Sequence, residues 1–367
     1  MLARTAGARP VGRVSQKLRH PDRNSYIGKG KVQEIVDSRP DLQYSVAIFD
    51  DELSPAQQRN LENKLDVKII DRTALILDIF AQRARTREGK LQVALAQHEY
   101  LLPRLRGQWS HLERMEGAIG LRGPGETQLE TDRRLIRNQI KRLKQEIEQV
   151  RAQRKGYRQQ RQKSGVPIVA LVGYTNAGKS TLMNRLTHAD VTARNRLFET
   201  LDPVTRRCHL SDDLTVLLTD TVGFIQKLPT HLIAAFRATL EELSDADLLL
   251  HVVDVTHPDA AEQAQTVEDT LDALKAGDRP RLTVFNKADQ LEIEGIGQPR
   301  DLDDLAVAAE DLELVRPDAV LISAEKDWGI DALRSRVTEA LAGDVGIAPQ
   351  TPEPVFTAEV AEKTWVS

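Results

Sequence analysis

Residues 173–180 read Gly-Tyr-Thr-Asn-Ala-Gly-Lys-Ser and match G-x-x-x-x-G-K-[ST], the pattern of a loop that surrounds phosphate groups. The backbone N–H groups of such a loop donate to phosphate oxygens, Lys179 adds a positive charge, and the Ser180 hydroxyl can bind Mg²⁺. The flanks agree, because 168–172 reads as a buried strand and 181–187 as a helix start whose dipole favours anions. The pattern predicts a nucleotide-binding loop and leaves the base undefined.

A second motif, Asp220-Thr-Val-Gly223, directly follows another predicted strand. Asp220 can hold Mg²⁺ through water, and the Gly223 N–H can meet the terminal phosphate of a triphosphate. Between the two motifs lies Phe198-Glu-Thr-Leu-Asp-Pro-Val-Thr-Arg206, where a hydroxyl must reach the metal while its segment covers the phosphate. Thr200 is our choice for that hydroxyl, and Thr205 is the alternative.

The base is indicated by Asn286-Lys-Ala-Asp289, which ends a further strand. Asp289 can accept from the N1 and N2 protons of guanine, a pattern that adenine does not present. Asn286 can brace the phosphate loop, and the stem of Lys287 can cover the ring. After the last strand, Ser323-Ala324 can offer a backbone N–H to the guanine O6. Four motifs in this order predict a GTP site.

The predicted site forms three overlapping sets. The catalytic residues are Lys179, Thr200 and Gly223, and the metal ligands are Ser180, Thr200 and Asp220. The nucleotide-binding residues are Gly173, Tyr174, Thr175, Asn176, Ala177, Gly178, Lys179, Ser180, Thr181, Phe198, Glu199, Thr200, Leu201, Asp202, Asp220, Thr221, Val222, Gly223, Asn286, Lys287, Asp289, Ser323 and Ala324.

Two residues bear on the rate of hydrolysis. Phe224 follows Gly223, where several efficient GTPases have a glutamine that orients water. Since phenylalanine cannot hydrogen-bond water, we hypothesise that intrinsic hydrolysis is slow and that a partner completes the site. Asn176 lies inside the phosphate loop, and similar loops in some GTPases that lack the glutamine use an asparagine to hold K⁺ beside the phosphates. A plain loop-stabilising role for Asn176 is the alternative.

The elements that position these residues alternate along the second half of the chain. Strand patterns predict an α/β fold, a doubly wound and mostly parallel sheet with the nucleotide at the carboxyl ends of its strands. We place this domain at 164–345 and a short tail at 346–367. The predicted strands are 168–172, 204–210, 215–219, 248–253, 282–285 and 320–322.

The first half has a different pattern. Residues 1–88 read as a small α/β subdomain, with strands at 46–49 and 67–70, a helix at 73–83, and Ser54 and Pro55 opening another helix. Residues 89–163 predict an antiparallel helical hairpin with a Gly-rich break at 117–125. Its first helix spans 90–114. The second, from Gln128 to about Gln162, carries a heptad seam made of Leu129, Ile136, Ile140, Leu143, Ile147, Val150 and Tyr157.

Charge divides the chain in the same place. Residues 1–163 carry 33 Lys/Arg against 20 Asp/Glu, whereas the remainder is acidic, so the net charge of −4 conceals a basic half. A basic half favours a polyanionic partner over a merely solvated helix. The single cysteine, Cys208, excludes an internal disulfide and reads as structural within its strand. No apolar stretch approaches the ~20 residues of a membrane span and no secretory signal is visible, so we expect a cytoplasmic protein.

With these residues in view, the chain resembles the HflX family of ribosome-associated GTPases over roughly residues 5–345. The four motifs are similar to that family's, and so are Tyr26-Ile-Gly-Lys-Gly-Lys31 and Gly120-Leu-Arg-Gly-Pro-Gly-Glu-Thr-Gln-Leu-Glu-Thr-Asp-Arg-Arg134. The resemblance implies a GTPase that binds the large ribosomal subunit and rescues or splits stalled ribosomes. It also implies that Thr200 is the metal-side threonine. The family usually has one more strand before the region matching Leu2.

We therefore expect a monomer that binds GTP, GDP and Mg²⁺, with K⁺ at Asn176, and docks on ribosomal RNA in a nucleotide-dependent way. The candidate RNA contacts are Arg122, Arg133, Arg134, Arg137 and Lys141, although the segment of Arg122 could equally be a hinge. One alternative is a GTP-regulated module that pairs with a protein through its heptad seam. Another is a GTPase in ribosome assembly or RNA modification.

Overall fold

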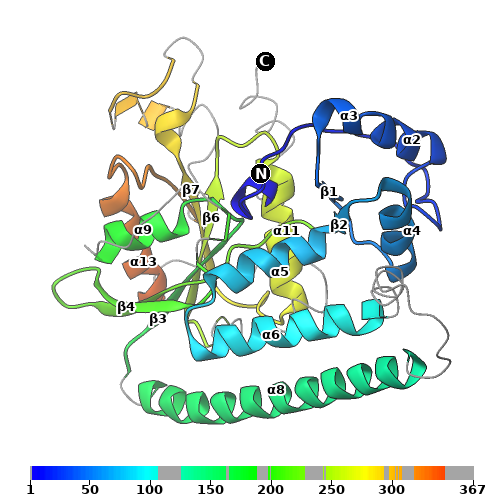
Figure 1. Cartoon of the computed structure of the whole chain (residues 1–367). Helices are drawn as coiled ribbons and strands as arrows, with labels where there is room; N and C mark the ends of the chain where they lie inside the picture. The colour runs from blue at the N-terminus through cyan, green and yellow to red at the C-terminus, as the bar shows by residue number, and fades with distance from the viewer. Residues whose placement is uncertain are drawn as a thin grey trace. The chain divides into compact units, whose positions relative to one another are not determined.

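The computed structural model describes residues 2–105, 125–162, 165–187, 197–198, 200–227, 243, 245–292, 297–301, 303–304, 306–307 and 318–343 (Figure 1). Arg122, Glu199, residues 117–124 of the Gly-rich break and the tail at 346–367 lie outside these residues. The chain forms two compact units, which we describe separately. The N-terminal unit comprises Met1–Ala152 with Pro229–Ala235, and the sheet unit comprises Gln153–Leu228 with Phe236–Ser367.

The N-terminal unit contains a two-stranded parallel sheet of β1 (Val46–Ile48) and β2 (Lys68–Ile70). Both predicted strands are thereby confirmed. The predicted helix start is confirmed as well, because Ser54 is the N-cap, Pro55 is the first helical residue, and Ser54 forms a capping box with Gln57. The helices of this part of the unit are α1 (Leu2–Thr5), α2 (Lys29–Asp37), α3 (Arg39–Leu42), α4 (Pro55–Leu65), which this capping box opens, and α5 (Arg72–Arg83).

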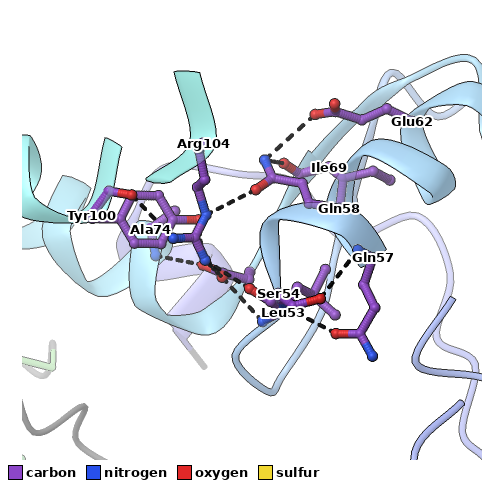
Figure 2. Close-up of polar contacts among 10 residues, drawn as sticks. Leu53, Ser54, Gln57, Gln58, Glu62, Ile69, Ala74, Tyr100 and Arg104 are labelled. Atoms are coloured by element: carbon purple, nitrogen blue, oxygen red, sulfur yellow. Dashed lines mark hydrogen bonds and ion pairs between the residues drawn. The ribbon is translucent and has the colours of Figure 1, made fainter. Parts of the chain in front are cut away.

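A buried polar network joins the elements of this unit. Asp71, at the N-cap of α5, is fully buried; one carboxylate oxygen accepts from Ala74 N and Tyr100 Oη, and the other from Leu53 N and Arg104 Nη2. Figure 2 shows Arg104 between Tyr100, Gln58 and Leu53. Its guanidinium lies 3.6 Å from the centre of the Tyr100 ring. An arginine whose charge is matched in this way ties the end of one helix to the rest of its unit.

That helix is α6 (Arg87–Leu101), followed by the 3₁₀ turn η1 (Leu102–Arg104). Within the expected helix over 90–114, the α-helix ends at Leu101, because Pro103 has no N–H to continue the hydrogen-bonding pattern; residues 106–114 lie outside the described residues. The long helix α8 spans Gly125–Gln162 and begins three residues earlier than expected, inside the predicted break. Its Lys144 pairs with Glu99 of α6 at 2.8 Å, which links the two predicted arms of the hairpin.

The apolar residues of the heptad seam predicted for α8 lie on the less exposed side of this helix, as far as their side chains are described. Ile136, Ile140, Leu143 and Val150 are half-buried, and Ile147 is buried. Leu135, one position off the seam, is 53% exposed. The helix thus packs through the seam and leaves its charged faces outward.

The sheet unit is built on six strands in the order β4-β5-β3-β6-β7-β8. Every pairing is parallel except that of β4 with β5, which confirms the predicted mostly parallel sheet. The strands are β3 (Ile168–Gly173), β4 (Val204–His209), β5 (Thr215–Asp220), β6 (Leu248–Asp254), β7 (Arg281–Asn286) and β8 (Ala319–Leu321).

Helices cover both faces of this sheet (Figure 1). One apolar core includes side chains of α9 (Lys179–Thr187) and α13 (Ile330–Ala342), and another includes side chains of α11 (Ala260–Ala273). Cys208 is buried in the first core and its thiol faces the Leu186 carbonyl, so its structural role is confirmed. No helix within the described ranges is long and apolar enough to cross a bilayer.

Candidate nucleotide-binding site

The phosphate loop connects β3 to α9 and depends on two glycines. Gly173 has φ +152°, and a Cβ there would lie 2.2 Å from the Val252 carbonyl oxygen. Gly178 has φ +99°, and a Cβ there would lie 2.1 Å from Asn286 Nδ2. Both positions combine a backbone conformation that favours glycine with a close approach that excludes any side chain. The loop geometry therefore requires these two glycines of the motif.

Lys179 is buried, and its ammonium donates to the carbonyl oxygens of Gly173 at 3.0 Å and Tyr174 at 2.9 Å. Burial lowers the pKa of Lys179 to about 8, against the attraction of Asp220. The cation is thus held by neutral carbonyls beside the loop. It can exchange these partners for phosphate oxygens, which stabilise its charge more strongly.

Three oxygen-bearing side chains meet behind the loop. The hydroxyls of Ser180 and Thr200 each donate to Asp220 Oδ2 at 2.7 Å and lie 3.0 Å from each other. Asp220 Oδ1 is buried and has no hydrogen-bond partner among the described residues. Burial raises the pKa of Asp220, while Lys179 and the hydrogen bonds of Thr200 and Ser180 oppose that change. Oxygen donors with one unsatisfied carboxylate oxygen fit a Mg²⁺ ion or its bound water.

The two threonines considered for the metal are separated by the fold. Thr205 lies in β4 opposite Thr219 of β5, and their hydroxyls are 3.0 Å apart. Thr200 precedes the strand and reaches Asp220 instead. The geometry therefore favours Thr200 for the metal, as the resemblance implied.

The segment after Gly223 is bonded to the phosphate loop. Phe224 N donates to the Gly173 carbonyl at 3.1 Å, and Thr175 N donates to the Phe224 carbonyl at 2.8 Å. The hydroxyl of Tyr174 accepts from Gln226 N at 3.1 Å. Phe224 itself is only 2% exposed. Nothing in the sequence pattern indicated that Tyr174 would hold this segment.

A cavity of about 50 Å³ lies at the loop. All of its lining residues were predicted to bind nucleotide: Thr175, Asn176, Gly178, Lys179, Ser180, Thr181, Phe198, Thr200, Thr221 and Gly223. Leu201, Asp202 and Val222 were also predicted but do not line it, and Leu201 and Val222 are buried apolar side chains. Glu199 lies outside the described residues.

The base-recognition motif lies at the ends of β7 and β8. Asn286 Nδ2 donates to the Ala177 carbonyl at 2.8 Å, and Asn286 Oδ1 accepts from Ala324 N at 3.0 Å. Asp289 is oriented by the Ser323 hydroxyl, which donates to it at 2.6 Å. The predicted residues of the two motifs are thereby connected. The sequence pattern did not indicate Asp254, which binds the Lys287 ammonium at 2.6 Å.

The candidate RNA contacts on α8 differ in exposure. Arg134, Arg137 and Lys141 are exposed, whereas Arg133 is half-buried. Spacings of three and four residues place Arg134, Arg137, Lys141 and also Lys144 on one helix face. A surface hollow of about 690 Å³ runs along α8, but all its lining residues belong to this single helix, so we interpret it as an open face.

A glycine-rich phosphate loop, a buried carboxylate beside it and a guanine-type Asn-Lys-x-Asp motif at one sheet edge define the class of P-loop GTPases. Three family models match in series: GTP-binding GTPase N-terminal at residues 1–81, GTP-binding GTPase middle region at 83–161, and 50S ribosome-binding GTPase at 168–287.

Relatives extend this match. GTPase HflX of Alkalihalophilus pseudofirmus is 48% identical over 342 residues, which cover 93% of this chain and 77% of the relative. GTPase HflX of Escherichia coli K12 is 48% identical over 344 residues, which cover 94% of this chain and 78% of the relative. A GDP complex of a GTP-binding protein from Sulfolobus solfataricus aligns with a TM-score of 0.47 at 25% identity over 93% of both chains. The chain belongs to the HflX family of GTPases, and it binds GTP and GDP and hydrolyses GTP.

Proposed function

We propose that this GTPase associates with the large ribosomal subunit through the basic face of its N-terminal half and splits or rescues stalled ribosomes. The observation that carries the proposal is the exposed row of Arg134, Arg137 and Lys141 on α8; Lys144, on the same face, is already paired with Glu99. Positive charges gathered on one helix face attract a polyanionic phosphate backbone. The match of residues 168–287 to the 50S ribosome-binding GTPase model supports the same partner. The proposal includes a cytoplasmic location and a monomeric protein.

The proposed nucleotide contacts follow from the site geometry. Lys179 leaves the Gly173 and Tyr174 carbonyls for the phosphates, and the Gly223 N–H meets the terminal phosphate. Ser180, Thr200 and Asp220 would hold Mg²⁺, which would neutralise charge on the phosphate oxygens. Asp289, held by Ser323, accepts from the guanine edge.

Nucleotide state is proposed to control ribosome affinity through the two segments that approach the terminal phosphate. Thr200 orders its segment in the triphosphate state and releases it after hydrolysis. The buried Phe224 supplies no group to orient water. Intrinsic hydrolysis is therefore slow, and the ribosome completes the site. Asn176, which has φ +67° and lines the cavity, is the proposed K⁺ ligand.

Pelleting with purified large subunits at graded salt tests the proposal. We expect binding that is stronger with a non-hydrolysable GTP analogue than with GDP. Neutralising Arg134, Arg137 and Lys141 to Gln should lower the salt slope by roughly two to three, because each lost phosphate contact removes about 0.7–0.9. The matched control replaces the exposed Arg59, Lys64 and Lys68 of the same unit by Gln. Binding that ignores both salt and nucleotide would exclude the proposal.

A protein-binding module that uses the α8 seam is less well supported, because the seam is already the less exposed side of the helix. Light scattering of intact ribosomes distinguishes the possible ribosomal roles. Loss of intact ribosomes with the analogue indicates splitting by binding, with hydrolysis as the reset. Binding to free large subunits alone, without loss of intact ribosomes, indicates a role in assembly or RNA modification.

A further inference from the structure

The carboxylate of Asp254 lies at the carboxyl end of β6, next to the base-recognition motif. Asp254 pairs with Asn286 in the register of β6 and β7, and Val255 N donates to the Asn286 carbonyl at 3.1 Å. The first residue after β7 is Lys287, whose ammonium lies 2.6 Å from Asp254 Oδ2. Asp254 therefore contacts the lysine of the guanine motif from the neighbouring strand.

This carboxylate is fixed independently of the lysine. Asp254 Oδ1 accepts from the Thr256 hydroxyl at 2.6 Å and from Thr256 N at 3.1 Å. The Asp254 side chain is 11% exposed and the Lys287 side chain 23%. A preoriented carboxylate in a largely buried position holds its partner more firmly than a surface ion pair does.

The backbone of Lys287 is constrained too. Lys287 has φ +69°, in the left-handed region, and the next residue, Ala288, donates its N–H to the Ile322 carbonyl at 3.1 Å. Because the backbone is held at Ala288 and the ammonium is held at Asp254, both ends of the Lys287 side chain are fixed. Its methylene groups form a short apolar surface two residues before Asp289.

We propose that Asp254 is a positioning residue for the purine ring, because it holds the Lys287 stem as the surface against which the ring packs. The inference rests on the proposed guanine site at Asp289. In this arrangement the Lys287 stem, held by Asp254, contacts the face of the purine ring, and Asp289 contacts its edge. A contact to the ring face is shared by all purines, whereas a contact to the edge depends on the exocyclic groups.

Affinities of Asp254→Asn for GDP, inosine diphosphate and inorganic tripolyphosphate test this assignment, with the exposed Asp259→Asn as matched control. We expect GDP and inosine diphosphate to bind roughly tenfold more weakly, because a charge-assisted hydrogen bond is lost. Competition by tripolyphosphate, which has no base, should be unchanged. Equal weakening of tripolyphosphate, or a loss confined to GDP, would overturn the proposal.

A double-mutant cycle separates positioning from simple stabilisation. In a Lys287→Met background, Asp254→Asn should cost no further affinity, since the ammonium it positions is gone. Equal losses in both backgrounds would contradict the proposal. If Asp254→Asn lowers the melting temperature too far, Thr256→Val replaces it, because this variant removes a hydrogen bond that orients the Asp254 carboxylate. Thr256→Val should weaken GDP and inosine diphosphate binding by a smaller factor. Unchanged affinity for both would count against the inference. Asp289→Asn reports on the guanine site itself, because it should shift preference from GDP to xanthosine diphosphate only if that site is correct.

Discussion

The side-chain amide of Asn286 donates to the carbonyl oxygen of Ala177 at 2.8 Å, across 109 residues of sequence. The same side chain accepts from Ala324 N at 3.0 Å. One residue therefore joins the phosphate loop to both segments expected to recognise the base. The phosphate loop and the segments expected to recognise the base are consequently held together by hydrogen bonds.

Asn286→Ala should weaken GDP binding roughly 5- to 150-fold, corresponding to about 1–3 kcal/mol, because a buried carbonyl and a buried N–H lose their partner. Fluorescence titration with labelled GDP measures the change. Gln290→Ala, at an exposed position of η2 (Ala288–Gln290), is the control and should bind normally. Unchanged affinity in Asn286→Ala would show that the contact is dispensable.

Thr200→Val should raise the Mg²⁺ concentration needed for half-maximal GTP hydrolysis, because one of the three convergent oxygens is removed. Thr205→Val, whose hydroxyl contacts Thr219 within the sheet, should leave the Mg²⁺ requirement unchanged. Rates over a Mg²⁺ titration compare the two variants. The opposite ranking would assign the metal to Thr205.

We expect the isolated wild-type protein to hydrolyse GTP slowly, because Phe224 cannot orient the attacking water. Ribosomes should accelerate hydrolysis markedly. The burial of this side chain also means that Phe224→Gln places an amide in an apolar environment, which should cost about 1–3 kcal/mol of stability. Single-turnover assays with and without ribosomes, together with urea unfolding, measure both effects. Rapid turnover of wild type and Phe224→Gln alike in the absence of any partner would reject the idea that the site is incomplete.

Hydrolysis should be faster in KCl than in NaCl if Asn176 holds K⁺ beside the phosphates. Asn176→Ala should abolish that difference, because the side-chain oxygen is lost. Rates at equal ionic strength in the two salts provide the measurement. Equal wild-type rates would leave Asn176 with only a loop-stabilising role.

Stability should fall in acid because of His251, which is buried in β6. Burial and the charges of Arg281 and Lys179 lower the pKa of His251 to about 3. Its Nδ1 lies 3.2 Å from Glu268 but makes no hydrogen bond, and Glu268 is bound by Arg281. In the unfolded chain the His251 imidazole is protonated below about pH 6.5, whereas in the native protein it stays neutral down to about pH 3. The free energy of unfolding therefore decreases as the pH falls from 6.5 toward 3.

The slope from this one group is at most about 1.4 kcal/mol per pH unit. His251→Gln should flatten the acid limb of a urea-unfolding series recorded without nucleotide, whereas the exposed His20→Gln should not. An acid limb that is the same in His251→Gln and wild type would assign the acid sensitivity to other groups.

The sequence by itself determined the strands, the mostly parallel sheet and the residues that line the cavity at the phosphate loop. These depend on local patterns: apolar runs of strand length, glycines needed for loop conformation, and motifs that follow strands whose carboxyl ends share one edge. It also predicted the seam of α8, because helical periodicity shows which side chains face inward.

Only the tertiary structure decided which distant residues support that site. Asp254 reaches Lys287 because β6 and β7 are neighbours in register, and Tyr174 reaches Gln226 because the segment after β5 turns onto the phosphate loop. The end of α6 at Leu101 and the contact of the Thr200 hydroxyl with Asp220 likewise depend on three-dimensional packing. The physical reason is that such contacts depend on strand order and chain direction, which residue spacing does not specify.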